Sequence, residues 1–421
     1  MEQKLWTLSV AGVLALVAGC GGGGGTLPQP VEVSSNITTN TTWSPNPAID
    51  CDYLVTANRE IEVRAALTIQ AGTKVCFGAN SGLKVMETGS LNAVGSAANR
   101  IVFTGTTASR GFWKGLAFRS NNPVNELSFA EVSFAGSNDS FCCDYFVSVN
   151  DIQAAVIVGS NATSTATLKL SNSLIASSAN YGLYVFGNGR LTVFSTNAFS
   201  DNTKAPVALP IIEAGKLDSG SNYSGAGLVA NAVNAVQVNR ISRSATNVNQ
   251  TLRKLNVPYA MFLGDPNTEQ EYDGALTLEP GVRMEFESNT GIKIMPTGSL
   301  NAVGTAAEPI VFTGRVAAKG FWKGLAFRSN NPSNRLERVT VEYAGNDDSF
   351  CCDYFVSVND IRAAILVGAN GVTNATLALV NSTVRESDNY GVYQFSGGNT
   401  ITASGNTYQN NDLGNQPPTL P

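Results

Sequence analysis

A long internal duplication constrains the fold of this chain more than any other feature of its sequence. Residues 111–123 recur unchanged at 320–332, an offset of 320 − 111 = 209 residues. The same offset relates residues 139–152 to 348–361. A repeat of this length indicates tandem duplication of one structural unit, so the fold must be one that can be built twice in succession.

The duplication divides the chain into segments. We expect a signal peptide at 1–19, a lipidated cysteine with a Gly/Pro tether at 20–30, copy one at 31–215, a joint or linking coil at 216–235, and copy two at 236–421. The joint is placed there because this stretch is rich in Gly, Ser and Asn, which favour turns and loops.

The N-terminal segment has the pattern of an export signal. A charged start precedes an apolar run, residues 5–18, that is too short for an ordinary membrane-spanning helix. The run ends in Leu16-Val17-Ala18-Gly19-Cys20, which resembles the lipobox of bacterial lipoproteins. The resemblance implies that Cys20 is acylated, and Gly21 after it implies sorting to the outer membrane, facing the periplasm or the outside. An ordinary signal peptide beside a chance cysteine is the alternative.

Within each copy, short apolar segments alternate with turns rich in Gly, Asn and Ser. Such segments occur at 67–69, 83–85, 101–103, 116–118 and 168–170, and long helical periodicity is absent. The pattern predicts an all-β chain of short strands. Its spacing is compatible with a sandwich, a propeller or a solenoid.

Family resemblance separates these three architectures. The strings at 276–281, 298–305, 309–313 and 322–325 look like successive coils of secreted bacterial right-handed parallel β-helix proteins with the pectin-lyase-like fold. The resemblance implies a β-solenoid made of two tandem copies, with Gly and Asn at tight corners that need positive φ. It also implies that these residues point inward: Leu91, Ala93, Ile101, Phe103, Leu116 and Phe118.

Six cysteines remain once Cys20 is assigned to lipid. Copy two has Val257 and Glu285 opposite Cys51 and Cys76, so these two cysteines are absent together, and we predict that they bond each other.

The other four cysteines form the adjacent pairs Cys142–Cys143 and Cys351–Cys352. We interpret each pair as a vicinal disulfide that stiffens an exposed loop. Free or interchain thiols are one alternative. Metal binding by these cysteines together with neighbouring aspartates is another.

The chain contains no histidine. This excludes Ser-His-Asp and Cys-His catalysis and His-ligated zinc. Because relatives of this fold include polysaccharide lyases and glycoside hydrolases, the catalytic candidates are Lys114, Arg119, Lys323 and Arg328. No string matches a lyase or hydrolase motif, so we interpret these as loop residues and expect a protein that is not an enzyme.

The repeated loop is instead the candidate binding region, because exposed aromatic rings stack on sugar faces. The ligand-binding candidates are Phe141, Asp144, Tyr145, Asp151, Phe350, Asp353, Tyr354 and Asp360. A calcium site beside each Cys-Cys loop, formed by Asp139 and Asp144 in copy one and by Asp348 and Asp353 in copy two, is a further alternative, and no other cofactor is expected.

The expected partners are therefore a membrane, reached through the lipid anchor, and a polysaccharide or another cell-surface ligand. The formal net charge of −5 and the lack of a basic cluster argue against nucleic acid. We expect a rigid β-helix presented for adhesion or glycan binding. The alternatives are a polysaccharide-degrading enzyme and a passive spacer.

Overall fold

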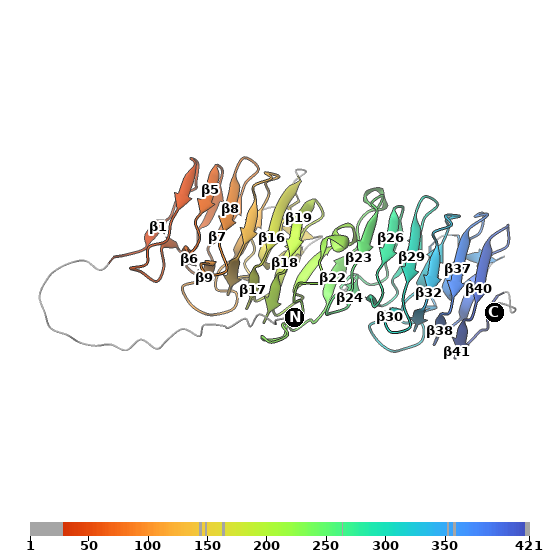
Figure 1. Cartoon of the computed structure of the whole chain (residues 1–421). Coiled ribbons are helices and arrows are strands. Elements are labelled where there is room, and N and C mark those ends of the chain that lie inside the picture. The colour runs from red at the N-terminus through yellow and green to blue at the C-terminus, as the bar shows by residue number, and fades with distance from the viewer. Residues whose placement is uncertain are drawn as a thin grey trace, which may run out of the picture.

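A computed structural model describes residues 28–416 except 143–144, 148–149, 162–164, 263, 352 and 357–358. The signal peptide, Cys20, Cys143, Asp144 and Cys352 therefore lie outside the described residues. The described chain is almost entirely β, with five long parallel sheets, and it forms an elongated stack of coils (Figure 1). This is the parallel β-helix that the sequence predicts.

Most coils contribute three short strands to three different sheets. In copy one, the first strands form a seven-stranded sheet of β1 (Val31–Val33), β3 (Tyr53–Val55), β6 (Lys74–Phe77), β9 (Ile101–Gly105), β12 (Ala130–Ser133), β17 (Leu174–Ala176) and β20 (Ala198–Ser200). The third strands form a six-stranded sheet of β2 (Thr41–Trp43), β5 (Ala66–Ile69), β8 (Ser90–Val94), β11 (Glu126–Ser128), β16 (Ala166–Ser171) and β19 (Gly189–Ser195).

A thirteen-stranded sheet runs through both copies. Its copy-one strands are β4 (Glu60–Val63), β7 (Gly82–Val85), β10 (Gly115–Phe118), β15 (Ala154–Val158), β18 (Tyr181–Val185) and β21 (Val207–Pro210). Its copy-two strands are β22 (Val236–Asn239), β24 (Tyr259–Met261), β27 (Arg283–Phe286), β30 (Ile310–Gly314), β33 (Val339–Glu342), β38 (Thr383–Arg385) and β41 (Thr407–Gln409).

Copy two adds two sheets of its own. A six-stranded sheet contains β23 (Gln250–Leu252), β26 (Ala275–Leu278), β29 (Ser299–Val303), β32 (Arg335–Glu337), β37 (Thr376–Val380) and β40 (Thr400–Ser404). A five-stranded sheet contains β25 (Glu269–Tyr272), β28 (Gly291–Ile294), β31 (Gly324–Phe327), β36 (Ala363–Val367) and β39 (Tyr390–Gln394).

The two copies join through direct strand pairing. β21 at the end of copy one pairs in parallel with β22 at the start of copy two. Two short 3-10 helices flank this pair, η1 (Ile211–Lys216) and η2 (Arg243–Ala245), and η1 packs against both β19 and β23. The coils therefore continue from one copy into the next.

The thirteen-stranded sheet changes its role at this junction. In copy one it holds the second strand of each coil, such as β10, whereas in copy two it holds the first strand, such as β30. Residues that the 209-residue offset makes equivalent therefore lie in different sheets: β10 belongs to the thirteen-stranded sheet and β31 to the five-stranded sheet.

The interior is a continuous apolar core. Of the residues predicted to point inward, all six are fully buried: Leu91, Ala93, Ile101, Phe103, Leu116 and Phe118. Trp113 and Trp322 are also fully buried and stack on Phe77 and Phe286, with ring centroids 3.8 Å and 4.1 Å apart. Within the described part of the chain, no helix is long and apolar enough to cross a membrane.

Corner and cysteine predictions also agree with the structure. Asn80 and its copy-two equivalent Asn289 adopt positive φ values of 59° and 55°, in the region that favours Gly and Asn. Cys51 and Cys76 form a disulfide with Cα atoms 5.9 Å apart, linking β6 to the segment before β3.

Candidate ligand-binding site

The repeated Cys-Cys loop folds back onto the outer face of the β-helix in each copy. In copy one it lies between β12 and β15 and carries a small antiparallel hairpin, β13 (Phe146–Val147) and β14 (Asn150–Asp151). Phe141, Tyr145 and Ile152 pack against Ala117 and neighbouring outer-face residues, which forms a second, smaller apolar core. The copy-two loop carries β34 (Phe355–Val356) and β35 (Asn359–Asp360) and packs in the same way.

A glycine on the outer face makes room for each loop. A Cβ atom on Gly82 would lie 2.6 Å from Cζ of Phe141, and a Cβ on Gly291 would lie 2.6 Å from Cζ of Phe350. Real Cβ atoms do not approach other atoms that closely, so only glycine lets the phenylalanine ring seat against the sheet. This pairing anchors the base of the loop.

The expectation that the loop aromatics are exposed is wrong. Phe141 and Phe350 are each 2 % exposed, and Tyr145 and Tyr354 are each 1 % exposed. Their rings pack against the outer face of the sheet because this removes more apolar surface from water than an exposed position in the loop would. Stacking of a sugar on these four rings is therefore not available.

Buried ion pairs hold the copy-two loop. Oε1 of Glu269 lies 2.9 Å from Nζ of Lys323 and accepts a 2.7 Å hydrogen bond from the backbone N–H of Cys351. Nζ of Lys293 lies 2.8 Å from the other oxygen of Glu269 and 3.0 Å from Glu271. The two lysines also donate to the carbonyl oxygens of Ser349 and Cys351, each at 3.0 Å.

Copy one repeats this ion-pair cluster at the 209-residue offset. Glu60 accepts from Lys114 at 2.8 Å and from the backbone N–H of Cys142 at 3.0 Å, while Lys84 lies 3.2 Å from its second oxygen. Lys84 also donates to the carbonyl oxygen of Cys142. In both copies, then, a partly buried carboxylate and two buried lysines fix the loop backbone at the first cysteine.

Sequence reasoning found only part of this cluster. Lys114 and Lys323 are among the candidates predicted from the sequence, but Glu60, Glu269, Lys84 and Lys293 are not. These four residues could have been found from the duplication, because Glu60 and Glu269, and likewise Lys84 and Lys293, are 209 positions apart. Their proximity depends on strand register, since Glu62 lies beside Lys84 and Glu271 beside Lys293 on neighbouring parallel strands.

The cluster perturbs the acidity of its carboxylates. Burial acts to raise the pKa of Glu60, but hydrogen bonds from Lys114 and from the Cys142 N–H, with the charge of Lys84, lower it overall. A hydrogen bond from Asn289, aided by Lys323, lowers the pKa of Asp348, and one from Asn80, with Lys114, lowers that of Asp139. Burial raises the pKa of Tyr354.

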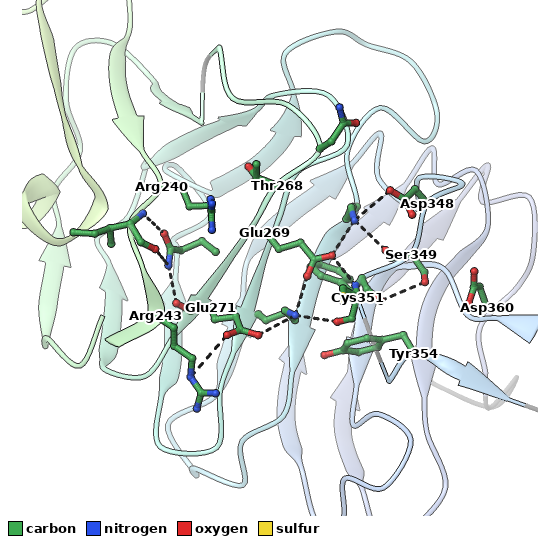
Figure 2. A pocket seen from close by; sticks show the side chains of 16 residues that line it. Arg240, Arg243, Thr268, Glu269, Glu271, Asp348, Ser349, Cys351, Tyr354 and Asp360 are labelled. Atoms are coloured by element: carbon green, nitrogen blue, oxygen red, sulfur yellow. Dashed lines mark hydrogen bonds and ion pairs between the residues drawn. The ribbon is translucent and has the colours of Figure 1, made fainter. Parts of the chain in front are cut away.

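The copy-two loop borders a pocket of about 660 Å³ (Figure 2). Arg240 and Arg243 from the junction lie on one side, Asp348, Ser349 and Asp360 from the loop region lie on the other, and Glu269 and Glu271 lie between them, as Figure 2 shows. The corresponding copy-one pocket measures about 260 Å³ and has no arginine in its lining. The junction therefore enlarges one of the two duplicated sites.

Cationic candidates are engaged in ion pairs in both copies. Lys114 and Lys323 belong to the buried clusters, with side chains 9 % and 6 % exposed. Arg119 lies 2.8 Å from Glu87, and Arg328 lies 3.0 Å from Asp353.

The remaining predicted residues are spread around the loop. Asp151 and Asp360 are exposed on the hairpins, and Asp353 forms an ion pair with Arg328. Cys142 and Cys351 are disulfide-bonded. Their predicted partners, Cys143 and Cys352, lie outside the described residues, so the vicinal pairing stays a prediction. Among the described residues, no group of three or more Cys, Asp or Glu side chains could hold a metal ion.

Comparison with known proteins adds no relative. Neither a family model, nor a curated protein, nor a solved structure matches this chain.

Proposed function

We propose that this chain is an exported, lipid-anchored β-helix protein that binds a glycan, without cleaving it, in the pocket of copy two. The observation that carries the proposal is the pocket of about 660 Å³ between the junction and the copy-two loop. Its size is within the range of small-molecule sites, and its polar groups converge on one space.

The rigidity of the site supports binding. The loop is fixed by buried ion pairs and by the seating of Phe350 over Gly291. A pre-organised site loses little conformational entropy when a ligand binds, so a modest number of hydrogen bonds gives useful affinity.

The ion pairing also argues against a lyase. A lyase of the kind that the fold resemblance implies needs a free cationic side chain to abstract a proton. Lys323 is instead held 2.9 Å from Glu269 and 3.6 Å from Asp348, so its amino group is committed to ion pairs.

The test uses full-length protein purified in detergent and a panel of bacterial, algal and plant polysaccharides, with binding and released products scored together. We expect binding without product release. Asp348→Asn should weaken binding, and the matched copy-one change Asp139→Asn should leave it intact. Release of products, or equal loss from both variants, would contradict the proposal.

Export and anchoring are tested separately. The disulfide between Cys51 and Cys76 supports an oxidising compartment, where such bonds persist. Several acyl chains on Cys20 would hold the protein stably on a membrane. Cys20→Ala should therefore release the protein into the soluble fraction, whereas continued membrane association would exclude lipidation at this residue.

A further inference from the structure

We infer that the copy-two pocket selects sugar residues that lack a carboxylate and rejects uronates, with the hydroxyl group of Tyr354 as one of its recognition groups. The inference rests on the proposed glycan-binding function and names the class of ligand.

The net charge of the pocket and its neighbours disfavours an acidic sugar. Its lining contains four cations, Arg240, Arg243, Lys293 and Lys323, and four carboxylates, Glu269, Glu271, Asp348 and Asp360. Two further carboxylates outside the lining pair with the arginines, Asp265 with Arg240 at 3.8 Å and Asp273 with Arg243 at 2.6 Å. The local formal charge is 4 − 6 = −2, so an acidic sugar meets net repulsion.

The exposed fractions of the charged side chains also favour a neutral sugar. The lysines are only 5 % and 6 % exposed, whereas the side chains of Asp348 and Glu271 are 68 % and 31 % exposed. Arg243 is already held by both oxygens of Asp273, at 2.6 Å and 3.1 Å. The side chains of Arg240 and Arg243 are 45 % and 47 % exposed, so a ligand meets two arginines that already have carboxylate partners, together with exposed carboxylates that accept hydrogen bonds from sugar hydroxyls.

Tyr354 supplies an independent observation. It is 1 % exposed, it lines the pocket, and its hydroxyl oxygen has no hydrogen-bond partner among the described residues. Figure 2 shows the hydroxyl end of the side chain directed toward the side where Glu271 and Arg243 lie. A buried hydroxyl without a partner is costly, and a ligand hydroxyl in the pocket would provide one.

The first experiment compares sugars that differ only at C6. Full-length protein in detergent is titrated with neutral tetrasaccharides of mannose, glucose and galactose and with the tetra-uronates of the same linkage. We expect at least one neutral sugar to bind about 10-fold or more tightly than its uronate, a difference of about 1.4 kcal/mol. Preference for a uronate would overturn the inference while leaving glycan binding intact. Binding of no sugar would overturn the proposed function itself.

The second experiment removes one oxygen atom. Tyr354→Phe keeps the ring in place, so we expect the affinity for the neutral sugar to fall about 3- to 10-fold while the melting temperature of the free protein stays the same or rises. The matched variant Tyr145→Phe, in copy one, should leave the affinity unchanged. Unchanged affinity in Tyr354→Phe would remove this residue from recognition, and a lowered melting temperature would indicate a structural role instead.

Discussion

Nζ of Lys323 lies 2.9 Å from Oε1 of Glu269, although 54 residues separate the two in the chain. Lys114 and Glu60 repeat the relationship at 2.8 Å, again across 54 residues. Glu269 begins β25 and Lys323 directly precedes β31, with β28 between these strands in the sheet. The ion pair therefore reaches across three successive coils, and the position of the loop depends on how those coils stack.

Lys323→Met should loosen the copy-two loop. The substitution leaves the largely buried Glu269 with Lys293 as its remaining lysine, so we expect a cost below the about 3–5 kcal/mol of breaking a fully buried ion pair from one side. Hydrogen exchange of residues 346–356 should become faster. The double variant Lys323→Met/Glu269→Gln should recover part of the protection, because the carboxylate that loses one of its two lysines is then replaced by a neutral amide. Unchanged exchange in the single variant would show that the loop is held by its apolar contacts alone.

Acid should open the copy-one loop. The pKa of Glu60 in the folded chain is below its ordinary value, so the ionised carboxylate stabilises the fold. This stabilisation is complete above the unfolded pKa of about 4.3 and is lost as the pH falls through the lower, folded value. The protection of the Cys142 amide, its exchange rate relative to that of an unfolded amide at the same pH, should fall below about pH 4. In Glu60→Gln this protection should already be low at neutral pH and change less with acid. A wild-type profile as flat as that of the variant would contradict the assignment.

Loss of the Cys51–Cys76 disulfide should destabilise copy one selectively. The bond between Cys51 and Cys76 closes a sequence separation of 25 residues, for which chain entropy predicts about 3 kcal/mol. Cys51→Ala/Cys76→Ala should increase hydrogen exchange in β3 and β6. The equivalent copy-two strands provide the control, because Val257 and Glu285 stand at the aligned positions there. Equal destabilisation of both copies would mean that the coils unfold as one unit.

The short strands and turns could be predicted because they leave local signatures, whereas the choice of a β-helix over a sandwich or a propeller came from the family resemblance. Leu116 and Phe118 are two residues apart, as expected for side chains on the same face of a strand, and both are buried. Asn80 is of a type common at corners, and it has a positive φ. The absence of both Cys51 and Cys76 from copy two was sufficient to pair them. Each of these signals lies in a short stretch of sequence or in the comparison of the two copies.

The site was less predictable because it is made between coils. Phe141 and Tyr145 looked like exposed loop residues, since nothing in the loop reveals that Gly82, far away in sequence, leaves a space beneath them. Likewise, the register that brings Glu62 beside Lys84 is a property of stacked strands. Arg243 reaches the pocket only because the junction brings it there.

Gly291→Ala should displace the loop anchor and reduce glycan binding. The added methyl group would lie 2.6 Å from Cζ of Phe350, a ring that is 2 % exposed and has little room to move. We expect a loss of about 1–3 kcal/mol in stability, as for other overpacked sites. Titration with the best-bound sugar and thermal unfolding check both effects. Gly82→Ala, which acts on copy one, should lower stability similarly and spare the binding. Retained binding in Gly291→Ala would show that the seating of Phe350 does not shape the pocket.

The pairing of β21 with β22 has a practical consequence for dissecting this molecule. If the chain were cut within 216–235, both strands would be left as open edges with unpaired backbone groups. Each edge also carries residues that are fully buried in the intact protein, including Val207, Leu209, Val236 and Val238. Half-molecules would therefore expose open strand edges and apolar side chains that are covered in the intact protein, and we expect them to aggregate more readily than the whole chain.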